Sequence, residues 1–262
     1  MFKFKLVVLI IILALGSTIA SASLRSSNAP FVENIAAGGT LSHDVKIDIP
    51  NETQAMDFET TIFGFGQDLN GGPVQIPANQ DNSSFSAIKL INVTPSSFRI
   101  EPNQSQIVTI KATMPNNAEA GTKYALVNIR GLPKKGTGTV NVALAINSRV
   151  QLTVTGSDLI RTGNITSIVL NPDGSAIVTL KNTGNTDYKA LAEGELKDSK
   201  GTILANTSSS LTNDIIPPYS RKFGLTFEPK GKLDPGKYTI NATVKLGDGT
   251  VIASKEESLD IK

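Results

Sequence analysis

The sequence contains no cysteine, no tryptophan and a single histidine, His43. The absence of cysteine excludes disulfides, thiolate metal sites and a lipid anchor attached through cysteine. No Gly-x-Ser-x-Gly motif is present for a serine hydrolase, and aromatic residues make up only 5% of the chain, which disfavours a cleft that stacks sugars. We therefore expect a protein without catalysis, cofactors or metal. A hydrolase that works with two carboxylates is the enzymatic alternative that the sequence leaves open.

The amino terminus has the three parts of a secretory signal. Lys3 and Lys5 precede an apolar run, Leu6–Leu15, and the small residues Ala20–Ala22 follow it. The run is shorter than the roughly 20 apolar residues that span a bilayer. We therefore predict a cleaved signal peptide over residues 1–22, no stable membrane span in the mature chain, and a location that is secreted, on the cell surface or in a periplasm-like space.

Charge is balanced once this leader is set aside. Two of the 25 basic residues belong to the leader, and 25 minus 2 leaves 23 against 23 acidic residues. A surface with no net charge has little electrostatic attraction for nucleic acid or anionic lipid. The sequence therefore predicts that nucleic acid is not a partner, and it leaves the oligomeric state open.

Apolar and polar residues alternate with a period of two over most of the remaining chain, as half-buried strands require. Proline and glycine separate these runs at a spacing of roughly 8–12 residues, which is typical of sandwiches and barrels. Outside the leader we find no convincing amphipathic helix. The clearest strand patterns are Val45–Ile49, Val108–Met114, Ile177–Leu180 and Thr239–Val244.

The longest alternating run is Val140–Val154, in which aliphatic residues share one parity and only Ser148 interrupts them. Its extended length would exceed a typical strand of about 20 Å. We therefore expect a bulge or break near Asn147–Arg149, or a strand that closes one domain and leads towards the next. Gly156 and Gly163 interrupt the pattern and predict a domain boundary near Thr155–Thr162.

A repeated unit indicates that the two halves of the chain are related. Each half has a proline turn, a strand, a second proline and then a glycine turn followed by a tyrosine, Tyr124 or Tyr238. This is the position of a tyrosine corner in immunoglobulin-like sandwiches, where the hydroxyl bonds back to the backbone. We predict an all-β protein with two tandem immunoglobulin-like β-sandwich domains, over residues 30–155 and 159–262, with structural tyrosine corners at both positions.

Several motifs resemble known families. Ala145–Leu152 is similar to the last strand of the first domain of pilus chaperones, whose alternating apolar residues complement a pilin subunit. Thr179–Asn185 resembles the adhesion-type β-sandwich domains of archaeal and bacterial surface proteins. A further set resembles both the amino-terminal domain of pilus chaperones and the peptidoglycan-binding region of WxL-interacting proteins: Asn92–Phe98, Ile100–Pro102, Met114–Pro115 and Gly121–Ala125.

Two regions are candidate interaction surfaces. In the chaperone-like strand these are the apolar residues Leu144 and Ile146, together with Arg149, the only candidate for a chaperone's basic anchors. The long segment Gly64–Ala87 has few charges, and we expect it to be an extended connection that is either functional or an insertion covering the core. Its candidate residues, with the one just before it, are Phe63, Phe65 and Phe85.

Polar motifs give weaker predictions. Asn-x-Ser/Thr sequons exceed the number expected from composition, and in a secreted chain each can carry a glycan, although a Ser/Thr/Asn-rich β surface explains them equally well. Asp68–Gly72 and Asn185–Asp187 offer oxygen ligands without the spacing of a strong calcium site, so we expect turns there. The glycosylation candidates are Asn51, Asn82, Asn103, Asn164, Asn206 and Asn241.

The leading hypothesis is a secreted, non-enzymatic structural or adhesion component of a cell envelope or extracellular surface. It would act through contacts with envelope or surface proteins or with cell-wall polymer. The alternative is a periplasmic-type chaperone for pilus or surface subunits that works by strand complementation. The carboxylate-based hydrolase ranks last.

Overall fold

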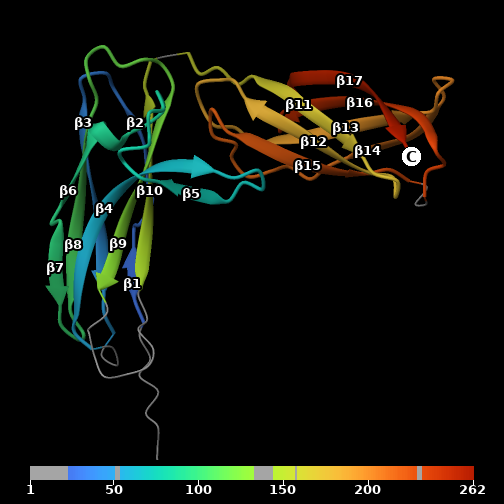
Figure 1. The fold of residues 1–262 in the computed structure, drawn as a ribbon. Helices are drawn as coiled ribbons and strands as arrows, with labels where there is room; N and C mark the ends of the chain where they lie inside the picture. The colour runs from blue at the N-terminus through green and yellow to red at the C-terminus, as the bar shows by residue number, and fades with distance from the viewer. Residues whose placement is uncertain (1–22, 51–53, 133–143, 157, 229–231) are drawn as a thin grey trace, which may run out of the picture.

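The computed structural model describes residues 23–50, 54–132, 144–156, 158–228 and 232–262. The predicted signal peptide and the start of the long alternating run, residues 140–143, lie outside these ranges. Figure 1 shows two β-sandwiches arranged as a bent, L-like pair, with the chain passing from β10 in the first to β11 in the second. The prediction of an all-β protein made of two tandem immunoglobulin-like sandwiches is confirmed.

The first sandwich consists of two sheets that face each other. One sheet has the strand order β1-β3-β8-β6; the other has the order β2-β10-β9-β4-β5, and β7 also pairs with β4. The strands are β1 (Arg25–Ser27), β2 (Phe31–Ile35), β3 (Thr40–Asp48), β4 (Met56–Gln67), β5 (Pro73–Ile76), β6 (Ile91–Thr94), β7 (Ser97–Ile100), β8 (Ser105–Thr113), β9 (Thr122–Leu132) and β10 (Ala145–Val154), with a 3-10 turn, η1, at Ile88–Leu90.

The second sandwich pairs a sheet of order β11-β12-β15 with one of order β14-β13-β16-β17. Neighbouring strands in both sheets are antiparallel. The strands are β11 (Gly163–Leu170), β12 (Ser175–Asn182), β13 (Ala190–Lys197), β14 (Ile203–Ser208), β15 (Ser220–Thr226), β16 (Gly236–Leu246) and β17 (Val251–Ile261).

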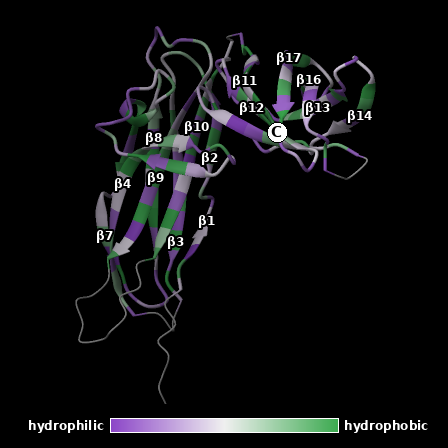
Figure 2. Cartoon of the chain, turned by 45° about the vertical axis from the view of Figure 1, so that its right-hand side comes forward, coloured by the Kyte–Doolittle hydropathy of each residue, from purple (hydrophilic) through white to green (hydrophobic). Residues whose placement is uncertain are grey.

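Each sandwich has its own hydrophobic core. Successive side chains of a strand point to opposite faces, so each strand is banded in hydropathy along its length (Figure 2). Phe31, Phe58 and Leu152 are completely buried in the first core, while Phe223 and Leu180 are buried in the second. Because no described residue belongs to both clusters, the two sandwiches are packed as separate units.

The chain changes sheets between β1 and β2, and side chains fix this crossing. β1 pairs with β3, whereas β2 pairs with β10 in the facing sheet. Asn28 adopts a φ of 59°, its side-chain amide donates to the Asp44 carbonyl at 3.0 Å, and its own carbonyl accepts from His43 Nε2 at 2.7 Å. The His43 ring also stacks on Phe31, with centroids 4.7 Å apart. The single histidine therefore holds the crossing in place.

The long run around β10 forms one continuous strand without the expected break, and the alternative holds: β10 closes the first sandwich and leads to β11. Its antiparallel register with β9 runs from Ala145 to Thr153 without a shift, so there is no bulge near Asn147–Arg149. Ser148 keeps the inward parity, is fully buried and donates its hydroxyl to the Ala29 carbonyl of the crossing. The pairing on the other edge of β10 changes near this point, because β2 pairs with β10 only from Val150 to Val154.

Only the second part of the segment Gly64–Ala87 is an extended connection, because its first part forms a β-hairpin. Its first residues complete β4, which pairs with β5 to form a hairpin from Gly64 to Ile76. Asp68 Oδ1 accepts the N–H groups of Asn70 and Gly72, each at 2.8 Å, and so closes the hairpin turn. Figure 1 shows this hairpin leaving the first sandwich and reaching towards β15 of the second.

Candidate functional site

One half of β10 has a strand on only one side. β2 pairs in parallel with Val150–Val154, whereas Ala145–Arg149 pair only with β9 among the described strands. Within a strand, backbone groups alternate in direction. The Leu144 carbonyl accepts a hydrogen bond from Gly131 N on β9, and Thr155 N donates to the carbonyl of Ile35, the last residue of β2. The N–H and C=O groups of Ala145 and Asn147 therefore point towards an edge that no described strand occupies.

The same half of β10 has apolar residues at the margin of the core. Ile146 is opposite Ile129 on β9 and packs against the first core while remaining half-buried. Leu144 has the same parity and is also half-buried, whereas Val150 and Leu152 further along are completely buried. The predicted residues Leu144 and Ile146 thus lie beside the uncovered backbone, where an added strand would bury them further.

Two of the predicted aromatic residues, Phe63 and Phe65, lie on the other face of this sheet. Phe63 is opposite Leu126 of β9, and Phe65 is opposite Gln75 in the hairpin. The Phe85 carbonyl accepts Tyr124 N at 2.7 Å, which fixes the loop after β5 to β9. All three side chains are half-buried, and neither Phe63 nor Phe65 shares the inward face of Ile146. The two predicted surfaces are therefore separate in space.

Arg149 lies where the covered and uncovered halves of β10 meet. Its guanidinium is 3.7 Å from Asp214 Oδ2 of the second sandwich, and its side chain is 37% exposed. An exposed ion pair at this distance contributes little stability. Arg149 thus remains partly accessible to solvent beside the second sandwich.

A short segment of the second sandwich, Asn185–Asp187, joins the two units. The Asn185 carbonyl accepts Thr122 N at 2.9 Å, and the hydroxyls of Thr186 and Thr122 are 2.8 Å apart in a buried position. A side chain on Gly121, which has a φ of 118°, would collide with the Asn185 carbonyl. These residues, considered in the sequence as weak calcium ligands, are used for interdomain contacts.

The two repeated tyrosines use their hydroxyls differently. Tyr238 donates to the Asp234 carbonyl four residues upstream at 3.0 Å, as a tyrosine corner requires. Tyr124 donates instead to Asp187 Oδ1 in the second sandwich at 2.7 Å, and Gln151 Nε2 donates to the same oxygen at 3.0 Å. Burial and the nearby Asp187 charge raise the Tyr124 pKa well above its usual value, so its hydroxyl stays protonated and able to donate.

The β4–β5 hairpin forms a second joint. Gln67 Nε2 donates to the Asp214 carbonyl at 2.8 Å, and Gln67 Oε1 accepts Ile216 N at 3.2 Å. At the hairpin tip, the Leu69 carbonyl accepts Lys222 N of β15 at 2.8 Å. The Gln67 side chain therefore makes hydrogen bonds to two backbone groups of the second sandwich. Sequence reasoning missed both joints, because a glutamine on a strand and an Asn-Thr-Asp turn give no local signal of a distant partner.

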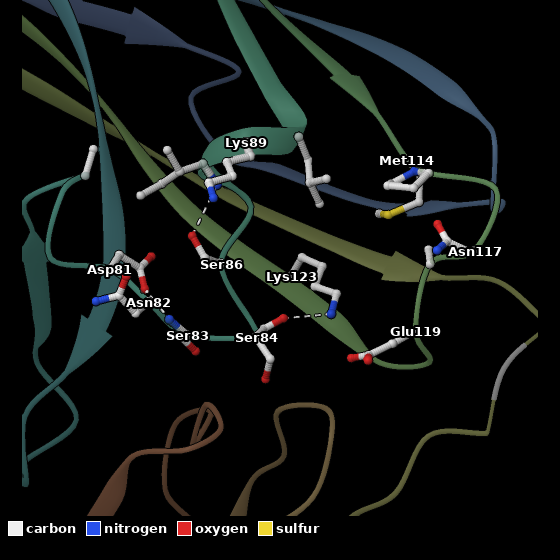
Figure 3. A pocket seen from close by; sticks show the side chains of 15 residues that line it. Asp81, Asn82, Ser83, Ser84, Ser86, Lys89, Met114, Asn117, Glu119 and Lys123 are labelled. Carbon is white, nitrogen blue, oxygen red and sulfur yellow. Dashed lines mark hydrogen bonds between the residues drawn. The ribbon is translucent and has the colours of Figure 1, made fainter.

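A cavity of about 430 Å³, lined by both polar and apolar side chains, lies beside the loop after β5. Figure 3 shows Asp81, Glu119 and Lys89 among its side chains, and Lys123 Nζ donating to the Ser84 carbonyl at 2.8 Å. Within the described ranges, no group of three or more His, Cys, Asp or Glu side chains could hold a metal ion. Likewise, the described residues contain no helix with the length and apolar character needed to cross a membrane.

The sequons differ in their surroundings. Asn82 and Asn103 are exposed in loops, Asn164 and Asn206 are exposed on β11 and β14, and Asn241 is half-buried on β16. Asn51 lies outside the described residues. Glycan attachment at these positions stays a prediction.

Neither a protein-family model nor a curated protein matches the chain. Similar solved structures include the Pseudomonas aeruginosa CupB2 chaperone, with 11% identity and a TM-score of 0.42 over 91% of this chain and 100% of that one. A CsuC–CsuE chaperone–tip adhesion subunit complex from Acinetobacter baumannii has 14% identity and a TM-score of 0.42 over 92% and 98%. A chaperone–tip adhesin complex of CFA/I fimbriae biogenesis has 11% identity and a TM-score of 0.46 over 91% and 98%. Values this low do not assign a role to the chain.

Proposed function

We propose that the chain binds an extended segment of another protein at the uncovered edge of β10 and acts as a non-enzymatic assembly chaperone for surface subunits in a periplasm-like space. The observation that carries the proposal is the change of neighbour along β10. Val150–Val154 have strands on both sides, whereas Ala145–Asn147 pair with only one described strand and lie beside half-buried apolar side chains.

The chemistry needed for this role is strand addition. An incoming strand exchanges hydrogen bonds with the backbone of Ala145 and Asn147, and its inward side chains cover Ile146 and Leu144. The hydrogen bonds give affinity with little dependence on sequence, while the apolar contacts fix the register. The two interdomain joints hold the second sandwich against the first before any strand is added.

A structural component of the cell envelope is the second candidate, and β14 favours it. This strand lies at the edge of its sheet, carries no charged residue, and exposes Ile203 and Leu204 by 52% and 41%. An uncharged, exposed edge can pair permanently with another chain. In that case the protein would fractionate with the envelope in high copy, whereas a chaperone would be recovered with one type of subunit.

Titration with short alternating Val/Asn peptides of about seven residues, a typical strand length, tests the proposal. The readout is amide hydrogen exchange of the full mature chain. We expect slower exchange at Ala145 and Asn147 on binding, and loss of binding in Ile146→Asp because a buried unpaired charge opposes pairing.

Ile107→Asp is the matched control, because Ile107 is 50% exposed on the facing sheet and should tolerate a charge without loss of binding. Binding that survives Ile146→Asp, or protection that appears only at β14, would overturn the assignment to β10.

A further inference from the structure

Three amide side chains meet on the outer face of the first sandwich, next to the uncovered edge. Asn147 Oδ1 accepts Asn128 Nδ2 of β9 at 2.7 Å and Gln75 Nε2 of β5 at 3.1 Å. Asn128 and Asn147 are opposite each other on the paired strands β9 and β10, and the β4–β5 hairpin brings Gln75 to them. We call Gln75, Asn128 and Asn147 the amide cluster.

The hydrogen-bonding capacity of the cluster is only partly used. A side-chain amide oxygen accepts two hydrogen bonds, so Asn147 Oδ1 is saturated and its orientation is fixed. Its Nδ2 group retains two hydrogens for which no described residue provides an acceptor. Gln75 Oε1 and Asn128 Oδ1 likewise accept no hydrogen bond from the described part of the chain. The cluster therefore offers both donors and acceptors to a ligand.

The position of the cluster relates it to strand addition. Asn147 is one of the two residues whose backbone faces the uncovered edge, so its side chain flanks any strand added there. Across the sheet, Asn147 is opposite Asn128, which is opposite Thr61 of β4, and this forms a polar row on the outer face. A strand paired with β10 would add one side chain to the end of that row.

We infer that Asn147 is a specificity-determining residue that selects a partner strand with an asparagine or glutamine on its outer face. This inference rests on the proposed function and names the chemistry of its partner. A partner amide can accept from Asn147 Nδ2 and donate to Gln75 Oε1 or Asn128 Oδ1. A carboxylate has no hydrogen to donate to those oxygens, and a leucine removes the cluster from water without replacing its hydrogen bonds.

Such a partner strand has two distinct faces. Its inward side chains are apolar, because they continue the row of Ile146 and Leu144, and its outward side chain beside Asn147 is an amide. One net hydrogen bond in an exposed site corresponds to roughly threefold to tenfold in affinity. The amide cluster thus adds a preference among partner strands that already bind through backbone hydrogen bonds.

The experiment uses peptides of about seven residues that alternate valine with asparagine, with its isostere leucine, or with aspartate. Dissociation constants are measured by calorimetry for the full mature chain, Asn147→Ala and Gln75→Ala. The unsubstituted protein is expected to prefer the asparagine peptide roughly threefold to tenfold. Asn147→Ala should abolish the preference, and Gln75→Ala should reduce it by releasing the Asn147 side chain. The control Asn92→Ala, an exposed asparagine on β6 of the facing sheet, should keep it.

The outcomes separate this inference from the proposed function. Equal binding of all peptides, with binding still lost in Ile146→Asp, would overturn the role of Asn147 and leave strand addition standing. A preference for asparagine that persists in Asn147→Ala would also overturn it. If no peptide protects Ala145 and Asn147 from exchange, the proposed function fails and this inference fails with it.

Discussion

The two ends of β10 have the same alternating pattern and the same neighbour, β9, yet they differ in whether a second described strand pairs with them. At the junction end, β2 covers Val150–Val154, and Gln151 joins the Tyr124–Asp187 contact with the second sandwich. At the distal end, Ala145–Asn147 have no second strand among the described residues. The difference arises because the crossing between β1 and β2, held by His43 and Ser148, brings β2 to the sheet only at Val150.

This comparison shows that burial alone does not reveal the candidate site. Both ends have apolar side chains facing the core, but among the described strands a partner on both edges is found at the junction end alone. An unpaired edge invites another strand, and natural proteins cover or charge such edges when they are not used. The distal end of β10 carries no charge before Arg149 and is therefore suited to pairing.

The largest expected difference between the ends is in stability. Leu152→Ala at the junction end should lower the free energy of unfolding by about 2–5 kcal/mol, because it leaves a cavity in a fully buried site. Ile146→Ala at the distal end should lower it by only about 1 kcal/mol, since the site is half-exposed. Urea denaturation followed by circular dichroism measures both. Equal losses would show that the distal end is covered as well as the junction end.

A smaller effect is expected from the interdomain hydrogen bond at the junction end. Tyr124→Phe removes a donor to the Asp187 carboxylate and should cost about 1.5–3 kcal/mol, because the acceptor is charged. Tyr238→Phe removes a neutral bond within the second sandwich and should cost about 0.5–1.5 kcal/mol. Small-angle scattering should detect a changed domain arrangement in Tyr124→Phe alone. The same scattering curve for both variants would argue against an interdomain role for Tyr124.

The smallest effect is expected at the boundary between the two ends. Arg149→Gln breaks an exposed ion pair with Asp214 and should change stability by less than about 1 kcal/mol. The thermal midpoint should therefore barely move, while binding of the alternating peptides is retained. A large loss of stability would mean that the Arg149–Asp214 pair holds the bend more firmly than its 3.7 Å separation indicates.

Much of the fold was predictable from local pattern. The alternation over Val108–Met114 and Thr239–Val244 corresponds to β8 and β16, and the proline and glycine turns separate strands as expected. Of the two alternatives for the long alternating run, the break was wrong, because β9 pairs with β10 over its whole described length. The other was right, since β10 closes the first sandwich and leads to β11. The sequence predicts a connection over Gly64–Ala87, whereas the structure has a hairpin in its first part. A hairpin that contacts another domain has no distinct sequence pattern.

The candidate site was predictable only in part. The apolar parity of Leu144 and Ile146 is visible in the sequence, and the structure places both beside a backbone edge that no described strand occupies. The amide cluster could not be found, because Gln75 and Asn147 are 72 positions apart and meet only through the path of the hairpin. The same holds for Gln67, which is 147 positions from the carbonyl to which it donates.

The sequence by itself determined that the described chain is built of strands, where the turns fall and which side chains face inward, since these follow from periods of two and from residues that break strands. Tertiary structure alone decided which strand has one neighbour and which has two, and which polar side chains join the two sandwiches. Those features depend on contacts between residues far apart along the chain, and no local pattern records such contacts.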